Sequence, residues 1–178
     1  MPAFMSEFFT QFISLLQANL NVLDLGAGSG RQAIAIAQRG CKVWAVDKNP
    51  AKVQHKLITW QTLPIETWLQ KPSSTRYDAV LMNNIVQFFS KGWVTGVLIP
   101  ELAKRTTDRC LFGIRTFFKL PEPAFENSTV LSYWTAQELL SLFPGWKCLH
   151  QNQQSAAAAD MTGRERLFHN SSIIVQQQ

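Results

Sequence analysis

The chain has 178 residues, of which 46% are apolar and 16% are charged, a composition typical of a globular protein rather than a disordered one. Its net charge is +5, but the basic residues are dispersed, whereas a nucleic-acid-binding surface needs a basic patch or stripe. No apolar run approaches the roughly 20 residues of a membrane helix, and the first residues lack the basic segment of a signal peptide. We therefore expect a cytoplasmic protein with no membrane partner. Nucleic acid as a partner is compatible with the charge but not favoured.

The cysteines and histidines are also dispersed along the chain. None of them has the spacing of a zinc site, a redox pair or a disulfide framework. Three isolated cysteines fit a reducing compartment, and no metal site is expected. The residues concerned are Cys41, Cys110, Cys148, His55, His150 and His169.

Helical and strand-length apolar patterns alternate along the first half of the chain. Pro50 fits the first turn of a helix, and Gly40 fits the residue after the end of one. In chain order, the predicted elements are a helix at 6–19, a strand at 21–25, a helix at 31–39, a strand at 42–47, a helix at 50–56, a strand at 57–60, a helix at 65–69 and a strand at 77–82.

The second half continues this alternation and then changes. A helix is predicted at 94–104, a strand at 109–118, and a helix from the capping box at 135–138 to residue 142. Two closing strands follow, at 146–150 and 166–175. The Gln- and Ala-rich residues 151–159 between them are predicted to form a loop or a weak helix.

This order of elements predicts an α/β fold with a mainly parallel sheet that is covered by helices on both faces. The last two strands have no helix between them, which indicates a terminal antiparallel hairpin with its loop at residues 151–163. We expect one domain over residues 1–178, with an N-terminal helix in residues 1–20 and a Rossmann-like core at residues 21–178.

A glycine-rich loop follows the first predicted strand and precedes a helix. Such a loop allows a ligand to approach the backbone closely, and it is expected to leave N–H groups pointing into a cleft at the carboxyl ends of the strands. The loop residues assigned to a cofactor are Gly26, Ala27, Gly28 and Gly30.

The spacing within this loop distinguishes between two cofactors. A dinucleotide fingerprint needs a small residue at position 31, where this chain has Arg31. S-adenosylmethionine has no pyrophosphate and does not need that residue. The carboxylate of Asp24 is expected to pair with the cationic methionine end of this cofactor, and Arg31 is expected to pair with its carboxylate. Asp47, which Lys48 follows in the same predicted site, lies 21 residues after Gly26, where an acidic residue accepts from ribose hydroxyls.

The segment from Val22 to Asp47 resembles motif I and its acidic partner in class I S-adenosylmethionine-dependent methyltransferases. The chain is most similar to the tellurite-resistance-type (TehB-like) family, through residues 28–31, 39–47, 83–89, 133–146 and 163–166. The resemblance implies seven strands with the last antiparallel, and methyl transfer that leaves S-adenosylhomocysteine. Pro64 stands where the family often has an acidic residue, so adenine recognition is expected to use the Ile65 backbone.

Residues after the fourth strand face the methyl group in this fold family. By that resemblance, Asn83 is expected to contact the cofactor, while Asn84 and Gln87 orient a substrate and Arg166 closes over the site from the hairpin. The favoured acceptor is a small molecule, such as a thiol or an oxyanion. The alternatives are an RNA or protein methyltransferase, a non-catalytic S-adenosylmethionine-binding protein and, disfavoured by Arg31, a nicotinamide-dependent enzyme. The oligomeric state stays open.

Overall fold

The computed structural model of the chain describes residues 6–51, 53–122, 129–160 and 162–178. The helices are α1 (Glu7–Ser14), α2 (Arg31–Gln38), α3 (Ile65–Leu69), the 3₁₀ turn η1 (Val86–Phe88), α4 (Lys91–Trp93), the π-helical segment η2 (Val94–Leu98), α5 (Ile99–Ala103) and α6 (Ala136–Leu140). The strands are β1 (Asn21–Leu25), β2 (Lys42–Asp47), β3 (Ile58–Thr62), β4 (Tyr77–Asn83), β5 (Thr106–Phe117), β6 (Lys147–Ala159) and β7 (Glu165–Gln176).

The seven strands form one sheet in the order β3-β2-β1-β4-β5-β7-β6. Strands β1 to β5 run parallel, and β7 is antiparallel to both of its neighbours. The predicted fold class, a Rossmann-like sheet with an antiparallel last strand, is therefore confirmed. None of the helices in the described part of the chain is long and apolar enough to cross a bilayer.

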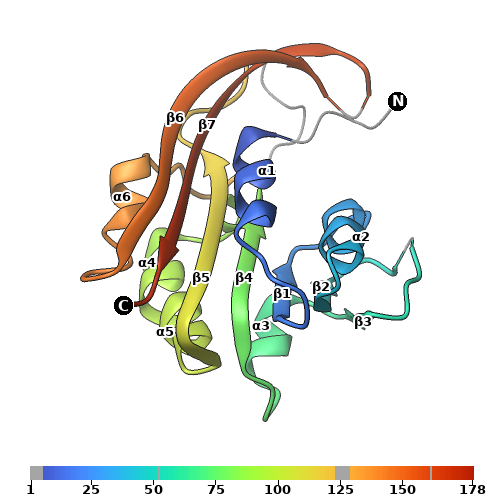
Figure 1. The fold of residues 1–178 in the computed structure, drawn as a ribbon. Helices are drawn as coiled ribbons and strands as arrows, with labels where there is room; N and C mark the ends of the chain where they lie inside the picture. The colour runs from blue at the N-terminus through green and yellow to red at the C-terminus, as the bar shows by residue number, and fades with distance from the viewer. Residues whose placement is uncertain (1–5, 52, 123–128, 161) are drawn as a thin grey trace.

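Helices cover the sheet on both faces (Figure 1). Helices α1 and α2 pack on one face through Phe12 and Ile36, and the remaining helices pack on the other through residues such as Trp68 and Leu98. Helix α1 comes close to β5 because Gly113 has no side chain; a Cβ there would lie 2.5 Å from the ring of Phe12. Since both faces of the inner strands are buried, their sequences are nearly continuous apolar runs.

The predicted helix at 50–56 is wrong for the residues of this segment that the structure describes. The Asp47 side chain accepts from the backbone N–H of Asn49, which forms a turn instead of a first helical turn. A second turn follows at His55, whose Nδ1 accepts from Leu57 N–H. Pro50 therefore lies between two turns, in a segment that lacks the apolar face of a helix.

The terminal hairpin is confirmed, but the predicted loop at residues 151–159 is wrong, because these residues continue β6. They pair with β7 from Gln151 opposite Ile173 to Ala159 opposite Glu165. Strand β7 offers a free edge along its whole length, and this pairing overrides the weak strand propensity of the Gln- and Ala-rich segment. The hairpin continues past the end of β5 and bends over the side on which α1 lies (Figure 1).

Two helices differ from their predicted bounds by three or more residues at one end. Helix α1 ends at Ser14, because Leu15 and Leu16 donate to carbonyls three residues back and the chain then turns. The helix predicted at 94–104 begins at Lys91 and includes the π-helical segment η2, in which Ile99 N–H donates to the Val94 carbonyl. Pro100 follows directly, and the wider π turn accommodates a residue that cannot donate. The prolines at positions 121 and 123 also predict a loop at residues 121–127, and most of that segment lies outside the described residues.

Candidate functional site

The loop between β1 and α2 is held by hydrogen bonds to its own protein. The N–H groups of Gly26 and Ala27 both donate to the Val46 carbonyl, at 2.8 and 3.1 Å, and Gly30 N–H donates to Ala27 O at 2.9 Å. Gly28 N–H donates to the Asp47 carboxylate at 2.8 Å. The expectation that these N–H groups point into a cleft is therefore wrong. These hydrogen bonds hold the loop against β2. The loop would therefore contribute to a ligand site through its shape and not through N–H donors.

Two of the three loop glycines are required by neighbouring side chains. A Cβ on Gly26 would lie 2.7 Å from Ile85, and a Cβ on Gly30 would lie 2.4 Å from Val53 and 2.8 Å from Trp60. A Cβ on Gly28 would meet no atom nearer than 3.9 Å. Gly28 has a positive φ of 55°, as glycine readily adopts, and it borders open space into which a methyl group would project.

Asp47, the last residue of β2, supports the loop and remains available to a ligand. One carboxylate oxygen accepts from Gly28 N–H, and the other accepts from the backbone N–H and the side-chain amide of Asn49, at 2.8 and 3.0 Å. The residue is 8% exposed. A carboxylate has about four acceptor positions and three are used here, so about one remains for a ribose hydroxyl.

Asp24, in β1, is the most unusual ionisable group of the site. It is 1% exposed, and neither carboxylate oxygen has a hydrogen-bond partner among the described residues. Burial, together with the neighbouring charge of Asp47, raises its pKa from an ordinary value of 3.8 to about 7. An isolated buried carboxylate is unfavourable, so this position suits a cationic or hydrogen-bond-donating ligand group.

The end of β4 adds further unsatisfied polar atoms. The side-chain oxygens of Asn83 and Asn84 are buried without partners among the described residues. Leu81 pairs with Asp24, so Asn83, two residues on, lies on the same face of the sheet as that carboxylate. Asn84 has a φ of 56°, and its N–H donates to the Arg115 carbonyl.

Gln87 lies in a different environment from the two asparagines. It is 1% exposed and accepts from the Thr116 hydroxyl at 3.0 Å, while its carbonyl accepts from Leu131 and Ser132. These bonds connect η1 to β5 and to the segment before α6. A role for Gln87 in orienting a substrate stays a prediction, and its observed contacts are structural.

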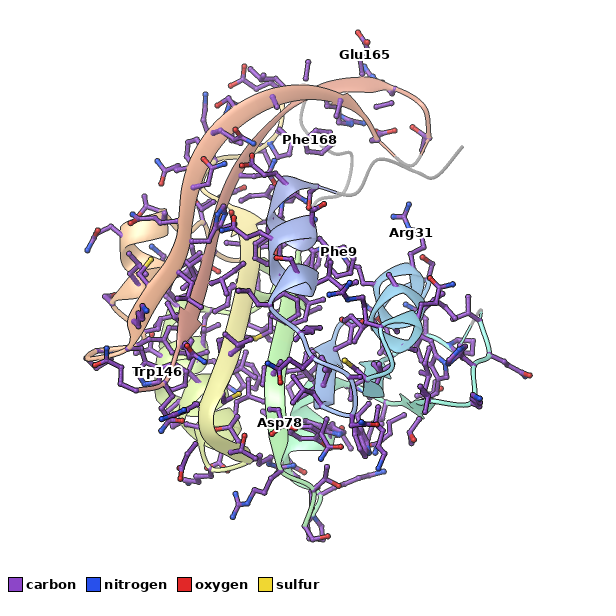
Figure 2. The ribbon with its side chains drawn as sticks, in the orientation of Figure 1. Phe9, Arg31, Asp78, Trp146, Glu165 and Phe168 are labelled. Atoms are coloured by element: carbon purple, nitrogen blue, oxygen red, sulfur yellow. The ribbon has the colours of Figure 1, made fainter. Side chains whose placement is uncertain are left out.

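The remaining predicted cofactor residues lie around the same edge. Ile65 is the first residue of α3, where a helical N–H has no partner within the helix, and Pro64 before it is the N-cap. Leu63 donates to the Asp47 carbonyl, which brings the start of α3 beside the end of β2. Lys48 is exposed. Figure 2 shows Arg31 projecting from the N-terminal end of α2, at this edge of the sheet.

The opposite edge is closed by hydrogen bonds. The Asp78 carboxylate accepts from Asn21 N–H at 2.8 Å and from the Thr107 hydroxyl at 2.9 Å, and Figure 2 shows it at the other end of β4. The polar atoms without partners at the ends of β1 and β4 are Asp24 Oδ1, Asp24 Oδ2, Asn83 Oδ1 and Asn84 Oδ1. The carboxyl edge is therefore the candidate ligand site, as expected for an open α/β sheet.

Comparison with known protein families agrees with this geometry. The family model described as "Methyltransferase domain" matches residues 1–90, half of the chain. The chain belongs to this methyltransferase family. Family membership confirms the predicted enzyme class, and the matched half contains the glycine loop, Asp24, Asp47 and the end of β4.

A curated relative and several solved structures extend the comparison. The ribosomal protein L11 methyltransferase of Polynucleobacter necessarius is 30% identical in an alignment of 156 residues, and the match covers 79% of this chain and 44% of the relative. TehB from Haemophilus influenzae superposes with a TM-score of 0.77 at 15% identity, over 98% of this chain and 63% of that one. NodS from Bradyrhizobium japonicum, crystallised with S-adenosylhomocysteine, superposes with a TM-score of 0.68 at 14% identity, over 96% and 86%. The chain thus spans less than half of the curated relative.

Arg166, predicted to close over the site, lies in the distal part of the hairpin. Its Nε donates to the Asp160 carboxylate at 2.6 Å, and both side chains are buried. Hydrogen bonds from the Thr162 hydroxyl and from Arg166 hold the pKa of Asp160 well below its usual range. This pair fixes the hairpin turn. Contact between Arg166 and a substrate stays a prediction.

Sequence reasoning missed polar residues that strands β5 and β7 bring to the same edge. Arg115 pairs directly with Asn83 across β4 and β5, and Asn170 lies opposite Phe117 on β7. Arg115 is the one charged residue within residues 110–117 of β5, a signal in the sequence for a functional charge. The position of Asn170 could not be read from the sequence, because it depends on the register of an antiparallel strand.

Proposed function

We propose that this chain binds S-adenosylmethionine at the carboxyl edge of its sheet and transfers the methyl group to a small-molecule acceptor. The observation that carries the proposal is the unpaired, buried carboxylate of Asp24 beside the open space at Gly28. The cationic amino group of a methionine moiety would supply the partner that Asp24 lacks.

The other residues around the edge match the remaining parts of the cofactor. Asp47 would accept from a ribose hydroxyl, and the N–H of Ile65, which has no partner within α3, would donate to the adenine ring. Arg31, at the start of α2, would meet the methionine carboxylate. Asn83 would contact the part of the cofactor that lies over β4.

When bound, the cofactor supplies a sulfonium-activated methyl group for in-line displacement. The chain would then align the methyl group with the acceptor and exclude water. Alignment alone can lower the activation barrier of such a reaction by roughly 7–11 kcal/mol. The hairpin, which bends over the α1 side of the sheet, would shield the site from solvent (Figure 1). A dedicated base is needed only for an acceptor that arrives protonated.

Small acceptors are supported by the solved relatives. The structure of a 1,6-didemethyltoxoflavin N1-methyltransferase from Burkholderia thailandensis superposes with a TM-score of 0.69 at 15% identity, over 97% of this chain and 79% of that one. A thiol or an oxyanion as the acceptor stays the expectation that the resemblance in the sequence implies. The likeness to the L11 methyltransferase keeps a protein acceptor as the second candidate. A cytoplasmic location stays a prediction.

The direct test is methyl transfer from S-adenosylmethionine that carries a tritiated methyl group. The acceptor panel contains small thiols, small carboxylates, selenite, tellurite, a ribosomal protein fraction and RNA, with the Asp47→Ala variant as control. We expect label in a small-molecule product, and at least tenfold less with the variant at subsaturating cofactor. Label only in RNA or protein would contradict the small-molecule acceptor. No label with any acceptor, although S-adenosylhomocysteine binds, would contradict the proposed catalysis and indicate a non-catalytic binding protein.

A further inference from the structure

A small polar hollow lies beside the proposed methyl-donor site, on the face of the sheet that α1 covers. Its volume is about 30 Å³, and strands β5, β6 and β7 and the first turn of α1 form its walls. A water-sized group needs roughly 10–15 Å³, so the hollow accommodates about two oxygen-sized atoms. It therefore fits the charged end of a ligand, with the rest of the ligand outside.

Arg115 supplies the positive charge of this hollow. Its side chain is half-buried, and no hydrogen bond or ion pair of its guanidinium occurs among the residues that the structure describes. Burial lowers its pKa, and guanidinium pKa values start so high that the group stays charged. A partly buried cation without an ion-pair contact is unfavourable, and an anionic ligand would relieve that penalty.

Asn170, on β7, lines the hollow beside Arg115. It is 8% exposed, and its side-chain oxygen is buried with no hydrogen-bond partner in the described chain. The amide can turn about its terminal torsion and present its NH₂ group to an acceptor. Arg115, which is half-buried, and Asn170, which is buried, thus line one hollow, and neither side chain has a partner there among the described residues.

The position of the hollow relates it to the reacting centre. Arg115 is the register partner of Asn83, and its carbonyl accepts from Asn84 N–H at 2.7 Å. Adjacent strands are about 4.8 Å apart and successive residues about 3.3 Å, so Arg115, which is two strands away from Asp24 and two residues further along, lies about 12 Å from it. That separation leaves room for a methyl group between a cofactor anchored at Asp24 and an acceptor anchored at Arg115.

A negative charge at the rim of the hollow limits which anions can bind there. Glu7, in the first turn of α1, is exposed and also lines the hollow. Its charge is solvent-screened and offsets the attraction of Arg115 only in part. One net attractive centre and room for two oxygen atoms suit a carboxylate better than a phosphate dianion.

We propose that Arg115 and Asn170 form the acceptor-recognition subsite, and that the methyl acceptor is a small carboxylate whose charged group enters the hollow. This inference rests on the proposed methyltransferase function. It extends that function from an unspecified small molecule to a class of acceptor, and it assigns specificity to two residues outside the cofactor loop.

The test is a titration of the S-adenosylhomocysteine-loaded protein with benzoate and with benzamide, followed by ¹⁵N NMR of the arginine Nε–H and asparagine amide signals. We expect benzoate to shift the signals of Arg115 and Asn170 saturably, and benzamide to leave them unchanged. The Arg115→Met variant should lose at least tenfold in benzoate affinity. Arg115→Lys, which keeps the charge but loses the bidentate geometry, should retain an intermediate affinity.

The matched control is Arg76→Met, which removes the same charge from an exposed site before β4. It should bind benzoate as the unaltered protein does. Equal benzoate binding by Arg115→Met, or no saturable shift in the unaltered protein, would overturn the proposed subsite. Calorimetry with S-adenosylhomocysteine on the same samples separates the two ideas. Normal cofactor binding without benzoate binding contradicts only the subsite, and absence of cofactor binding contradicts the methyltransferase function itself.

Discussion

Asp24 is buried in β1 without a hydrogen-bond partner among the described residues, and its pKa is raised to about 7. A cationic ligand group binds the ionised form, so binding must remove the proton below that pH. We expect the affinity for S-adenosylhomocysteine to fall by about tenfold per pH unit below 7. Calorimetry between pH 5.5 and 8 measures this slope. The Asp24→Asn variant should bind weakly at every pH, and an unchanged slope in that variant would assign the proton to another group.

The raised pKa of Asp24 predicts that stability changes with pH in the opposite direction to cofactor affinity. Because the folded-state pKa of Asp24 lies above the value of 3.8, the folded protein holds a proton that the unfolded chain releases between these values. The contribution of Asp24 to stability therefore falls as the pH rises from about 4 to 7 and stays low above 7. Asp24→Asn should be more stable than the unaltered protein at pH 8 in urea unfolding. A less stable variant would mean that the carboxylate has a structural partner.

Asp47 has both a structural and a proposed binding role, which two substitutions separate. Asp47→Ala removes the acceptor for ribose and for Gly28 N–H, and we expect cofactor affinity to fall at least tenfold, or ~1.4 kcal/mol. Asp47→Asn keeps one acceptor oxygen for Gly28, so it should fold normally and show an intermediate loss. Calorimetry on both variants tests this ranking, and unchanged affinity in Asp47→Ala would remove the residue from the site.

At the scale of elements, the glycine loop offers two substitutions with different expected outcomes. Gly26→Ala places a methyl group 2.7 Å from Ile85 at a φ of 74°, and it should lower the free energy of unfolding by roughly 2–5 kcal/mol. The methyl group of Gly28→Ala would lie no nearer than 3.9 Å to any protein atom, so its stability loss is that of the positive φ alone, roughly 1–2 kcal/mol. Its methyl group should nevertheless block the cofactor. Urea unfolding and calorimetry measure both quantities, and normal cofactor binding by Gly28→Ala would contradict the placement of the ligand.

The elements around this loop were the most predictable from the sequence. The strands Asn21–Leu25 and Lys42–Asp47 and the helix Ile65–Leu69 have the predicted bounds, because apolar runs stop there at glycine, aspartate or proline. The capping box of Thr135 and Glu138 is also confirmed. Segments without an apolar pattern of their own were not predictable. The outer part of β6 is a strand because β7 pairs with it, and a helical first turn at Pro50 is replaced by hydrogen bonds to Asp47.

At the scale of the whole molecule, the strand order explains why the site could be predicted only in part. The glycine loop, Asp24 and Asp47 lie within one β-α-β unit, so their proximity follows from local sequence. Arg115 and Asn170 come from strands far along the chain, and they meet because β5 and β7 are neighbours in the order β3-β2-β1-β4-β5-β7-β6. The direction of the loop N–H groups also could not be predicted, because Val46 and Asp47 on the adjacent strand accept from them.

The central claim is that the carboxyl edge of this sheet binds S-adenosylmethionine and not a dinucleotide. Calorimetric titration of the whole chain at pH 8, with S-adenosylhomocysteine in one cell and NAD in another, tests it most directly. We expect saturable one-to-one binding of S-adenosylhomocysteine and no heat of binding with NAD, because Arg31 occupies the position where a dinucleotide fingerprint needs a small residue. Binding of NAD without binding of S-adenosylhomocysteine would contradict the account.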